Sequence, residues 1–376
     1  EDKMKQRDFL RHRLRITKKQ GGQHNMLKAE KKVISNLTKC YSIAPLTYNG
    51  SQHFLVAAEK TDRCILFDLD GKEEATVWNE PGGVMSMVQV PGTNGQFLAT
   101  HKFYSPNDSK EAKIVIATPD ESGTWSIRTL VCLPHVHRFD IIENQGINYL
   151  IACTLKSGHA YKDDWSMPGK VYVAELPLDL NPYNEEHQLP MTVLKDGMLK
   201  NHGYYKIAMG NTQTCVISCE QGVFQFYPPA QPGANWQINQ LLDTPASDAV
   251  LVDLDSDGDK ELVVLSPFHG DTICIYKKLG DHFSRVYEYP VKSPFTHAIW
   301  GGMLECGPAA IIGHRQGERN LIAFTYDPED GSYHADILDK DCGPANVFHF
   351  SYNNEDNLIS TNREIDEVAR YTILKI

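Results

Sequence analysis

The sequence contains seven copies of one motif, an apolar run that ends abruptly in polar residues, many of them charged or histidine. When the polar ends are aligned, the copies follow one another at steps of 42, 53, 66, 47, 47 and 48 residues. Short apolar runs at such a period are typical of β-propellers, in which each repeat is one four-stranded blade. The aligned polar residues are Glu59, His101, Thr154, Glu220, Pro267, His314 and Asn362.

The chain length of 376 residues fits this interpretation. About 350 residues divided among seven repeats give about 50 residues per repeat, the usual size of a propeller blade. From residue 26 onward, β-rich runs alternate with turn pairs such as Asn49-Gly50 and Asp330-Gly331, and no amphipathic helix or low-complexity linker interrupts them. We therefore predict an all-β fold, a seven-bladed β-propeller, formed by residues 26–376 as one domain.

The two ends of the chain predict how the ring closes. The last repeat supplies only three strands, over residues 346–351, 357–361 and 367–376. We expect the segment 26–37 to be the outer strand of the last blade, because this pairing removes an open sheet edge. Residues 1–25 form a basic arm with eight Lys or Arg and three acidic residues. A surface arm, a dimer contact and a cap on the propeller face all remain open for it, and with them a homodimer.

Composition excludes several classes of protein. The net charge of −11 argues against a nucleic-acid binder, which needs a basic face. No apolar stretch approaches the roughly 18 residues that span a membrane, so no membrane partner is expected. Nine cysteines is an odd number, and several lie inside apolar runs, where buried free thiols are common. We expect reduced thiols and a cytoplasmic protein, or a secreted one if a leader has been removed.

A second motif, rich in histidine, lies at the start of several of the repeats. In a propeller, equivalent positions of all blades converge on one axis, so His137, His202 and His297 should surround one mouth of the central channel. The ends of the second strands return to the same face and should add further polar side chains. The candidates for this second group are His101, Lys156, His269, His314, Arg315 and Arg363. A long insertion at residues 156–170 follows one of these ends, either as a lid over the pocket or as a packed loop.

These residue types favour one kind of chemistry. Histidine exchanges protons near neutral pH, and Arg or Lys can hold a carboxylate or stabilise an enolate oxygen. Such a set suits proton abstraction next to a carbonyl or carboxylate, whereas glycoside hydrolysis needs a pair of acids at a defined separation. Converging imidazoles could instead bind a transition metal. The sequence therefore leaves an acid–base site and a metal site open.

An acidic run between two strand-like segments predicts a second metal site. Alternating carboxylates followed by glycine form a cage of hard oxygens suited to Ca²⁺ or Mg²⁺. The pattern is not an EF-hand, because Val264 stands where that motif needs a bidentate Glu. It resembles the calcium loop of integrin-type propeller repeats, for which we expect a structural role. The predicted ligands are Asp253, Asp255, Asp257, Asp259 and Glu261.

Beyond this loop, the chain resembles the propeller domain of fungal aldos-2-ulose dehydratases, which dehydrate 1,5-anhydro-D-fructose and glucosone. The matching segments are Phe268-His269-Gly270-Asp271-Thr272 with Ile275-Tyr276-Lys277, and His137-Arg138 at the start of a blade. The resemblance covers roughly residues 26–376. The cupin domains of that family have no counterpart, so an isomerase step assigned to them is not expected.

What the resemblance implies is a carbon–oxygen lyase acting on a keto-sugar or another sugar derivative. His137 matches the position of the base that removes the proton beside the carbonyl. The other implied roles are orientation or protonation for His202, His269, His297 and His314, and oxyanion or carboxylate binding for Lys156, Arg315 and Arg363. Related propellers include polysaccharide lyases that cleave next to a uronic acid. That activity and a non-catalytic carbohydrate- or protein-binding propeller remain the alternatives, and a small sugar or oligosaccharide is the expected partner.

Overall fold

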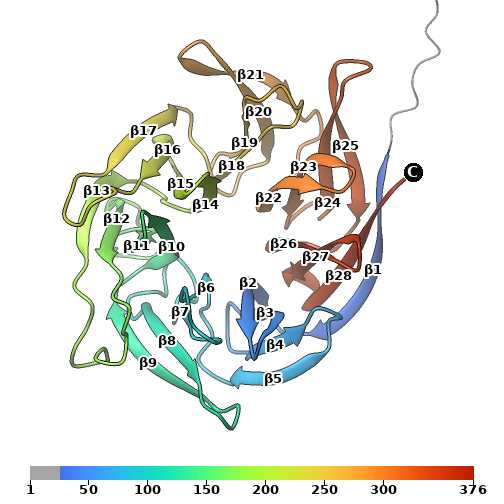
Figure 1. The fold of residues 1–376 in the computed structure, drawn as a ribbon. Coiled ribbons are helices and arrows are strands. Elements are labelled where there is room, and N and C mark those ends of the chain that lie inside the picture. Colours follow the sequence, from blue (N-terminus) through green and yellow to red (C-terminus); the bar gives the residue numbers. More distant parts are fainter. Residues whose placement is uncertain (1–25) are drawn as a thin grey trace, which may run out of the picture.

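The computed structural model describes residues 26–376, and the predicted basic arm lies outside the described residues. The described chain forms 28 β-strands and one short 3-10 helix, η1 (Arg363–Ile365). The strands build antiparallel sheets that are arranged in a ring around a common centre (Figure 1). The prediction of an all-β fold is confirmed. No helix within residues 26–376 has the length and apolar character needed to cross a membrane.

The strands of the described chain group into four-stranded units, which we number along the sequence. Unit 1 contains β2 (Cys40–Tyr48), β3 (Ser51–Ala58), β4 (Cys64–Asp68) and β5 (Glu73–Trp78). Unit 2 contains β6 (Met87–Gln89), β7 (Phe97–His101), β8 (Lys113–Pro119) and β9 (Trp125–Cys132). Unit 3 contains β10 (Val136–Asn144), β11 (Ile147–Thr154), β12 (Gly169–Glu175) and β13 (Thr192–Met198). Unit 4 contains β14 (Gly203–Met209), β15 (Thr212–Cys219), β16 (Gly222–Tyr227) and β17 (Gln237–Leu242).

The remaining units complete the ring. Unit 5 contains β18 (Asp248–Val252), β19 (Glu261–Ser266), β20 (Thr272–Leu279) and β21 (His282–Glu288). Unit 6 contains β22 (Thr296–Leu304), β23 (Gly307–His314), β24 (Leu321–Asp327) and β25 (Ser332–Asp339). Unit 7 contains β26 (Asn346–Tyr352), β27 (Glu355–Asn362), β28 (Glu367–Lys375) and β1 (Leu27–Asn36). Units 3 and 4 are joined into one eight-stranded sheet by a single pairing, Asn144 with Thr212.

The first strand of each unit lies nearest the centre of the ring. The innermost strands β2, β6, β10, β14, β18, β22 and β26 contact one another in this order, and β26 also contacts β2. The ring is therefore closed. The N-terminal strand β1 pairs antiparallel with β28, with Leu27 opposite Lys375, so the sheet order of unit 7 is β1-β28-β27-β26. This confirms the predicted closure of the last repeat by the N-terminal segment.

The repeated apolar motif is the second strand of each unit. These strands are covered by a neighbouring unit on both faces, which is why their sequences are continuous apolar runs rather than alternating patterns. In β3, for example, every residue from His53 to Ala58 is buried. The buried apolar side chains form a separate cluster at each junction between adjacent units, such as the packing of Leu55 in unit 1 near Phe97 of unit 2. All nine cysteines are free thiols.

Candidate metal and substrate site

The site begins with an irregularity that three innermost strands share. The strand register shifts between Cys40 and Ser42, between Val136 and Arg138, and between Thr296 and Ala298. The extra residues at these bulges are Tyr41, His137 and His297. A bulge re-aims the side chain of its extra residue. The bulges thus bring residues from units 1, 3 and 6 to one end of the ring.

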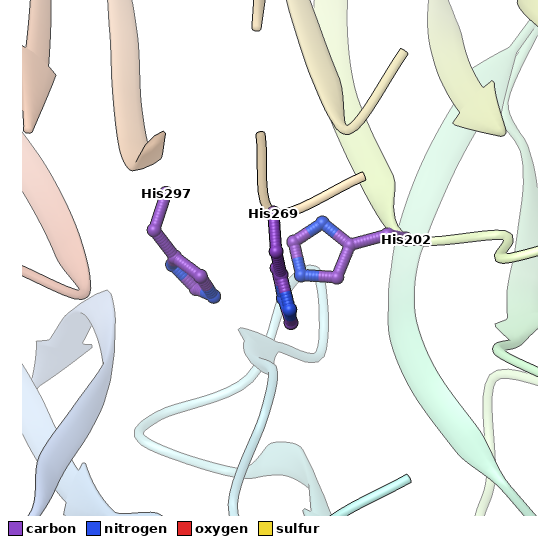
Figure 2. Close-up of side chains that lie close together, drawn as sticks. All are labelled: His202, His269 and His297. Carbon is purple, nitrogen blue, oxygen red and sulfur yellow. The ribbon is translucent and has the colours of Figure 1, made fainter. Parts of the chain in front are cut away.

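Four imidazoles meet at this end. The ring of His202, which directly precedes β14, lies 4.6 Å from that of His137 and 5.1 Å from that of His297, measured between centroids. His269, from the loop between β19 and β20, lies 5.0 Å from His202. Figure 2 shows His202, His269 and His297 converging from three different segments. The structure therefore brings these four predicted site residues together.

Two of the imidazoles are held in a defined tautomer. Nδ1 of His202 donates to the carbonyl of Ser247 at 3.0 Å, and Nδ1 of His297 donates to the carbonyl of Ala345 at 2.6 Å. A carbonyl can only accept, so Nδ1 carries the proton and Nε2 keeps its lone pair. Nε2 of His202 is buried and has no hydrogen-bond partner within residues 26–376, whereas Nε2 of His297 accepts from the hydroxyl of Tyr41 at 2.9 Å.

His269 is positioned by aromatic packing. Its ring is stacked between Phe268, at 3.9 Å, and Phe295, at 4.1 Å, measured between centroids. Its backbone φ of 49° lies in the left-handed region, which is uncommon for a residue with a side chain. The tight turn and the two flanking rings hold the imidazole toward His202 and His297.

Burial keeps these histidines neutral. It lowers the pKa of His202 to about 3, with the charge of Arg138 as the next cause. Burial also lowers the pKa values of His137, His269 and His297 well below the usual value for histidine. Loss of hydration disfavours the charged imidazolium, so all four rings are uncharged at neutral pH. Neutral imidazole is the form that binds a metal ion.

The geometry of three of these rings fits a metal ion. One nitrogen each of His202, His269 and His297 lies within 4.8 Å of the others. Two imidazole nitrogens on one Zn²⁺ ion are at most about 4.2 Å apart, twice the usual Zn–N distance. Binding would require the three side chains to move closer together and the hydroxyl of Tyr41 to release Nε2 of His297, because Nδ1 of that ring is already bonded to Ala345. The Nδ1–carbonyl hydrogen bonds of His202 and His297 also match the outer contacts that orient metal-bound histidines.

Two predicted site histidines lie outside this cluster. His314 uses both ring nitrogens within its own hairpin, Nδ1 donating to the carbonyl of Gln316 at 2.8 Å and Nε2 accepting from the backbone of Asn320 at 3.0 Å. His101 packs edge-on against Trp78, at the junction of units 1 and 2, with 4.7 Å between ring centroids. The expectation that every second strand delivers its last residue to the pocket is therefore not met for these two.

The predicted cations are largely engaged with other protein groups. Arg363 pairs with Glu59, and both Arg363 and Arg315 pair with Glu364. Arg315 also lies 4.4 Å from the centroid of the Phe295 ring, so this network borders the cluster without entering it. The network ties unit 1 to units 6 and 7 on the face of the site.

Lys156 is fully buried and holds the inserted loop. Its ammonium donates to the carbonyl of Asp164 at 2.8 Å and lies 4.2 Å from the centroid of the Trp165 ring. Trp165 in turn packs against Phe268, with 5.4 Å between centroids. The loop is therefore packed, as one of the two sequence interpretations expected, and it supports the aromatic residue that flanks His269.

The structure adds residues that the sequence did not single out for the site. Tyr41 bonds to His297, and Asp248 is buried at the opening of β18. Asn346, at the start of β26, accepts from Arg138 and donates to the carbonyl of Tyr41. Their alignment with the histidine-bearing blade openings was the available signal. That signal was present for Asp248 and Asn346, whereas Tyr41 belongs to a repeat whose opening lacks histidine.

The acidic loop lies between β18 and β19, as predicted, but it already contains a cation. Carboxylate oxygens of Asp253, Asp255 and Glu261 lie within 4.8 Å of one another. The ammonium of Lys277 pairs with Asp255, Asp257 and Glu261. A divalent ion and this ammonium would compete for the same oxygens. The residues present therefore do not fit Ca²⁺ or Mg²⁺ unless Lys277 moves away.

Comparison with known proteins settles the fold and leaves the family open. No family model and no curated protein matches the sequence. The structure of BBS1N in complex with ARL6DN matches with a TM-score of 0.54 and 12% identity, over 93% of this chain and 97% of that chain. The streptogramin B lyase structure matches with a TM-score of 0.53 and 12% identity, over 93% of this chain and 98% of that chain. The fold is that of a β-propeller. At this identity the likeness of the propeller to these proteins concerns the fold alone.

Proposed function

We propose that this protein is a carbon–oxygen lyase acting on a sugar derivative, built on a seven-bladed propeller in which units 1 to 7 are the blades. The observation that carries the proposal is the group of three neutral imidazoles, His202, His269 and His297, with a fourth, His137, beside them. The resemblance of His137-Arg138 and of the segment around His269 to aldos-2-ulose dehydratases supports the same reaction class.

The three imidazoles are the proposed ligands of a divalent transition metal ion. Such an ion would polarise the substrate oxygen that it binds, which makes the neighbouring C–H bond more acidic. The assignment changes the roles implied by the resemblance, because His202, His269 and His297 become ligands rather than groups that orient hydroxyls. Burial supports this role, since it keeps the rings uncharged and excludes competing water.

His137 remains the proposed base. Its Nδ1 is buried without a hydrogen-bond partner, and its ring lies next to His202. Removal of the proton beside the carbonyl would leave an enolate, and expulsion of the oxygen substituent on the next carbon would form the double bond. The proton passes to the imidazole, and the leaving oxygen takes a proton to depart as water or an alcohol. Burial raises the pKa of Tyr41, so its hydroxyl stays protonated and is the proposed donor.

The test is a screen for an unsaturated product. Keto-sugars and uronic-acid oligosaccharides are incubated with the protein, and the ultraviolet absorbance of the new double bond is followed. His137→Ala should slow the reaction by about 100-fold or more, the usual contribution of a general base, while the exposed His282→Ala serves as the control. An unchanged rate in His137→Ala would contradict the assignment. Sugars that bind without turnover would instead favour a carbohydrate-binding propeller.

A further inference from the structure

Within residues 26–376, the guanidinium of Arg138 forms no ion pair. Arg138 follows the bulge residue His137 on β10, and its side chain extends from unit 3 to Asn346 in unit 7. One Nη donates to the carbonyl of Met85 in front of β6, at 2.9 Å. The other lies 3.4 Å from the side-chain oxygen of Asn346 on β26. The guanidinium is thus held between units 3, 2 and 7, next to the ring of Tyr41 in unit 1, whose centroid is 5.8 Å away.

The hydrogen-bonding capacity of this group is only partly used. A guanidinium has five N–H donors, and Arg138 has two neutral acceptors. Its Nε is buried without a partner, and no carboxylate within residues 26–376 forms an ion pair with it, although its charge acts on the buried carboxyl of Asp248, whose pKa burial raises to about 7. A buried donor of a charged group that is left without an acceptor is costly. Arg315 and Arg363, at the same face of the ring, do not have this problem because they share Glu364.

The position of Arg138 connects it with the proposed reaction. Tyr41 lies between Arg138 and His297, because its ring faces the guanidinium and its hydroxyl bonds to Nε2 of His297. The side chain of Arg138 is half-buried. A ligand bound by the guanidinium would therefore lie next to the imidazole cluster.

The charge of the site selects the ligand. The guanidinium fork matches the two oxygens of a carboxylate, with which it forms paired hydrogen bonds. One unpaired positive charge balances one negative charge, whereas a phosphate monoester carries nearly two. The neighbouring cations Arg315 and Arg363 are already neutralised by Glu59 and Glu364. A monoanion suits the site better than a phosphate.

We infer that Arg138 binds the carboxylate of the substrate and that the substrate is a uronic acid or a uronic-acid glycoside. This inference rests on the proposed lyase function, because it names the class of sugar that the same site would act on. When a carboxylate is attached to the reacting carbon, the negative charge of the enolate is delocalised onto the carboxylate oxygens. Arg138 would bind this charge directly.

The test compares binding of two sugars that differ only in the carboxylate, methyl β-D-glucuronide and methyl β-D-glucoside, by titration calorimetry. The corresponding galacto pair is measured in the same way. The native protein should bind at least one uronide about tenfold or more tightly than its neutral partner, as expected for charge-assisted hydrogen bonds. Arg138→Met should abolish this preference, and Lys200→Met, which removes a half-exposed cation beside Trp165 and Phe268, should keep it.

Arg138→Lys covers the case in which Arg138→Met does not fold. It keeps the charge but loses the fork, so the preference should fall several-fold. A metal ion in the imidazole cluster could also bind the carboxylate, so the titrations are repeated on chelator-treated protein. The part of the uronide preference that depends on Arg138 should persist after chelation. The inference is overturned if neither uronide binds at about millimolar concentration, if acid and neutral sugar bind equally, or if both Arg138 variants keep the full preference.

The outcome is distinct from that of the lyase test. An Arg138-dependent preference for uronides without any unsaturated product would support this site and contradict the lyase. Elimination from neutral keto-sugars with no preference for uronides would support the lyase and overturn the carboxylate site.

Discussion

Two residues of the imidazole cluster, His202 and His297, are fixed by hydrogen bonds to a neighbouring segment. Ser247 and Ala345, at the openings of units 5 and 7, accept from the histidines of the preceding units. These contacts determine which nitrogen carries the proton and leave the other one facing the cluster. A metal site requires this arrangement before the ion arrives, because ligands that are already oriented lose less freedom on binding.

Asp248 allows a test of burial at the same openings. Burial raises its pKa from 3.8 to about 7, although the charge of Arg138 offsets part of the effect. The folded protein therefore holds this proton in a range of pH in which the unfolded chain has released it. Stability should fall as the pH rises from about 4 to about 7 and then level off.

Asp248→Asn should remove this dependence, because an amide has no proton to lose. Between pH 5 and pH 8 the unfolding free energy of the native protein should fall by about 2–3 kcal/mol more than that of the variant. Urea unfolding at the two pH values measures the difference, and the exposed Asp281→Asn is the control. Equal pH dependence in native protein and Asp248→Asn would show that this carboxyl is ionised when folded.

At the scale of strands and loops, bulges and turns decide which side chains reach the site. The bulges at Tyr41, His137 and His297 each insert one residue at the opening of an innermost strand. Without them, the strand alternation would place these side chains differently. The acidic loop of unit 5 is a similar case, because the cation that neutralises it comes from the next strand, β20.

Lys277 should make that loop independent of calcium. Removal of the ammonium in Lys277→Met leaves the buried Glu261 and its neighbouring acids without a cation, so stability should fall and Ca²⁺ should restore it. Thermal unfolding with Ca²⁺ or with a chelator measures this for the native protein, Lys277→Met and the exposed Lys278→Met. If Ca²⁺ stabilises the native protein and Lys278→Met as much as it stabilises Lys277→Met, the loop is a calcium site in the native protein and Lys277 is not its cation.

The strands were easier to predict than the site, and the reason is physical. The second strands are buried on both faces, so burial appears directly as an apolar run, as in residues 261–266. The convergence of His137, His202, His269 and His297 followed from the repeat alone. The positions of His101 and His314 did not follow from the repeat. A local hydrogen bond or an aromatic neighbour can hold a side chain away from the channel even when its place in the repeat predicts that it lies there. The pairing of Lys277 needs the register of β20, which the sequence does not show.

At the scale of the whole molecule, ring closure holds the site together. The four imidazoles come from units 3, 4, 5 and 6, and Tyr41 and Asn346 come from units 1 and 7, so the site exists only when the innermost strands meet around the centre. Strand β1 completes unit 7, and the backbone N–H of Leu27 also donates to Asp336 in unit 6 at 2.8 Å. The N-terminal strand is thus the part of the sequence that joins both ends of the ring.

Leu27→Ala should reveal this dependence. Leu27 is 2% exposed and packs between units 6 and 7, so its truncation should cost about 2–4 kcal/mol of unfolding free energy. Val33→Ala on the same strand removes a side chain that is 48% exposed and should change stability by about 0.5 kcal/mol or less. Urea unfolding compares the two. Similar small losses would mean that β1 contributes little to the closure.

The central claim is that His202, His269 and His297 form a metal site, and a titration with Co²⁺ followed by visible absorption tests it most directly. Co²⁺ bound by nitrogen ligands absorbs in the visible range, so the signal separates the imidazole cluster from the acidic loop of unit 5. We expect one Co²⁺ per chain to develop this absorption in the native protein and in His101→Ala, whose imidazole lies outside the cluster, and to fail to do so in His202→Ala. Absence of the absorption in the native protein, or its full retention in His202→Ala, would contradict the claim.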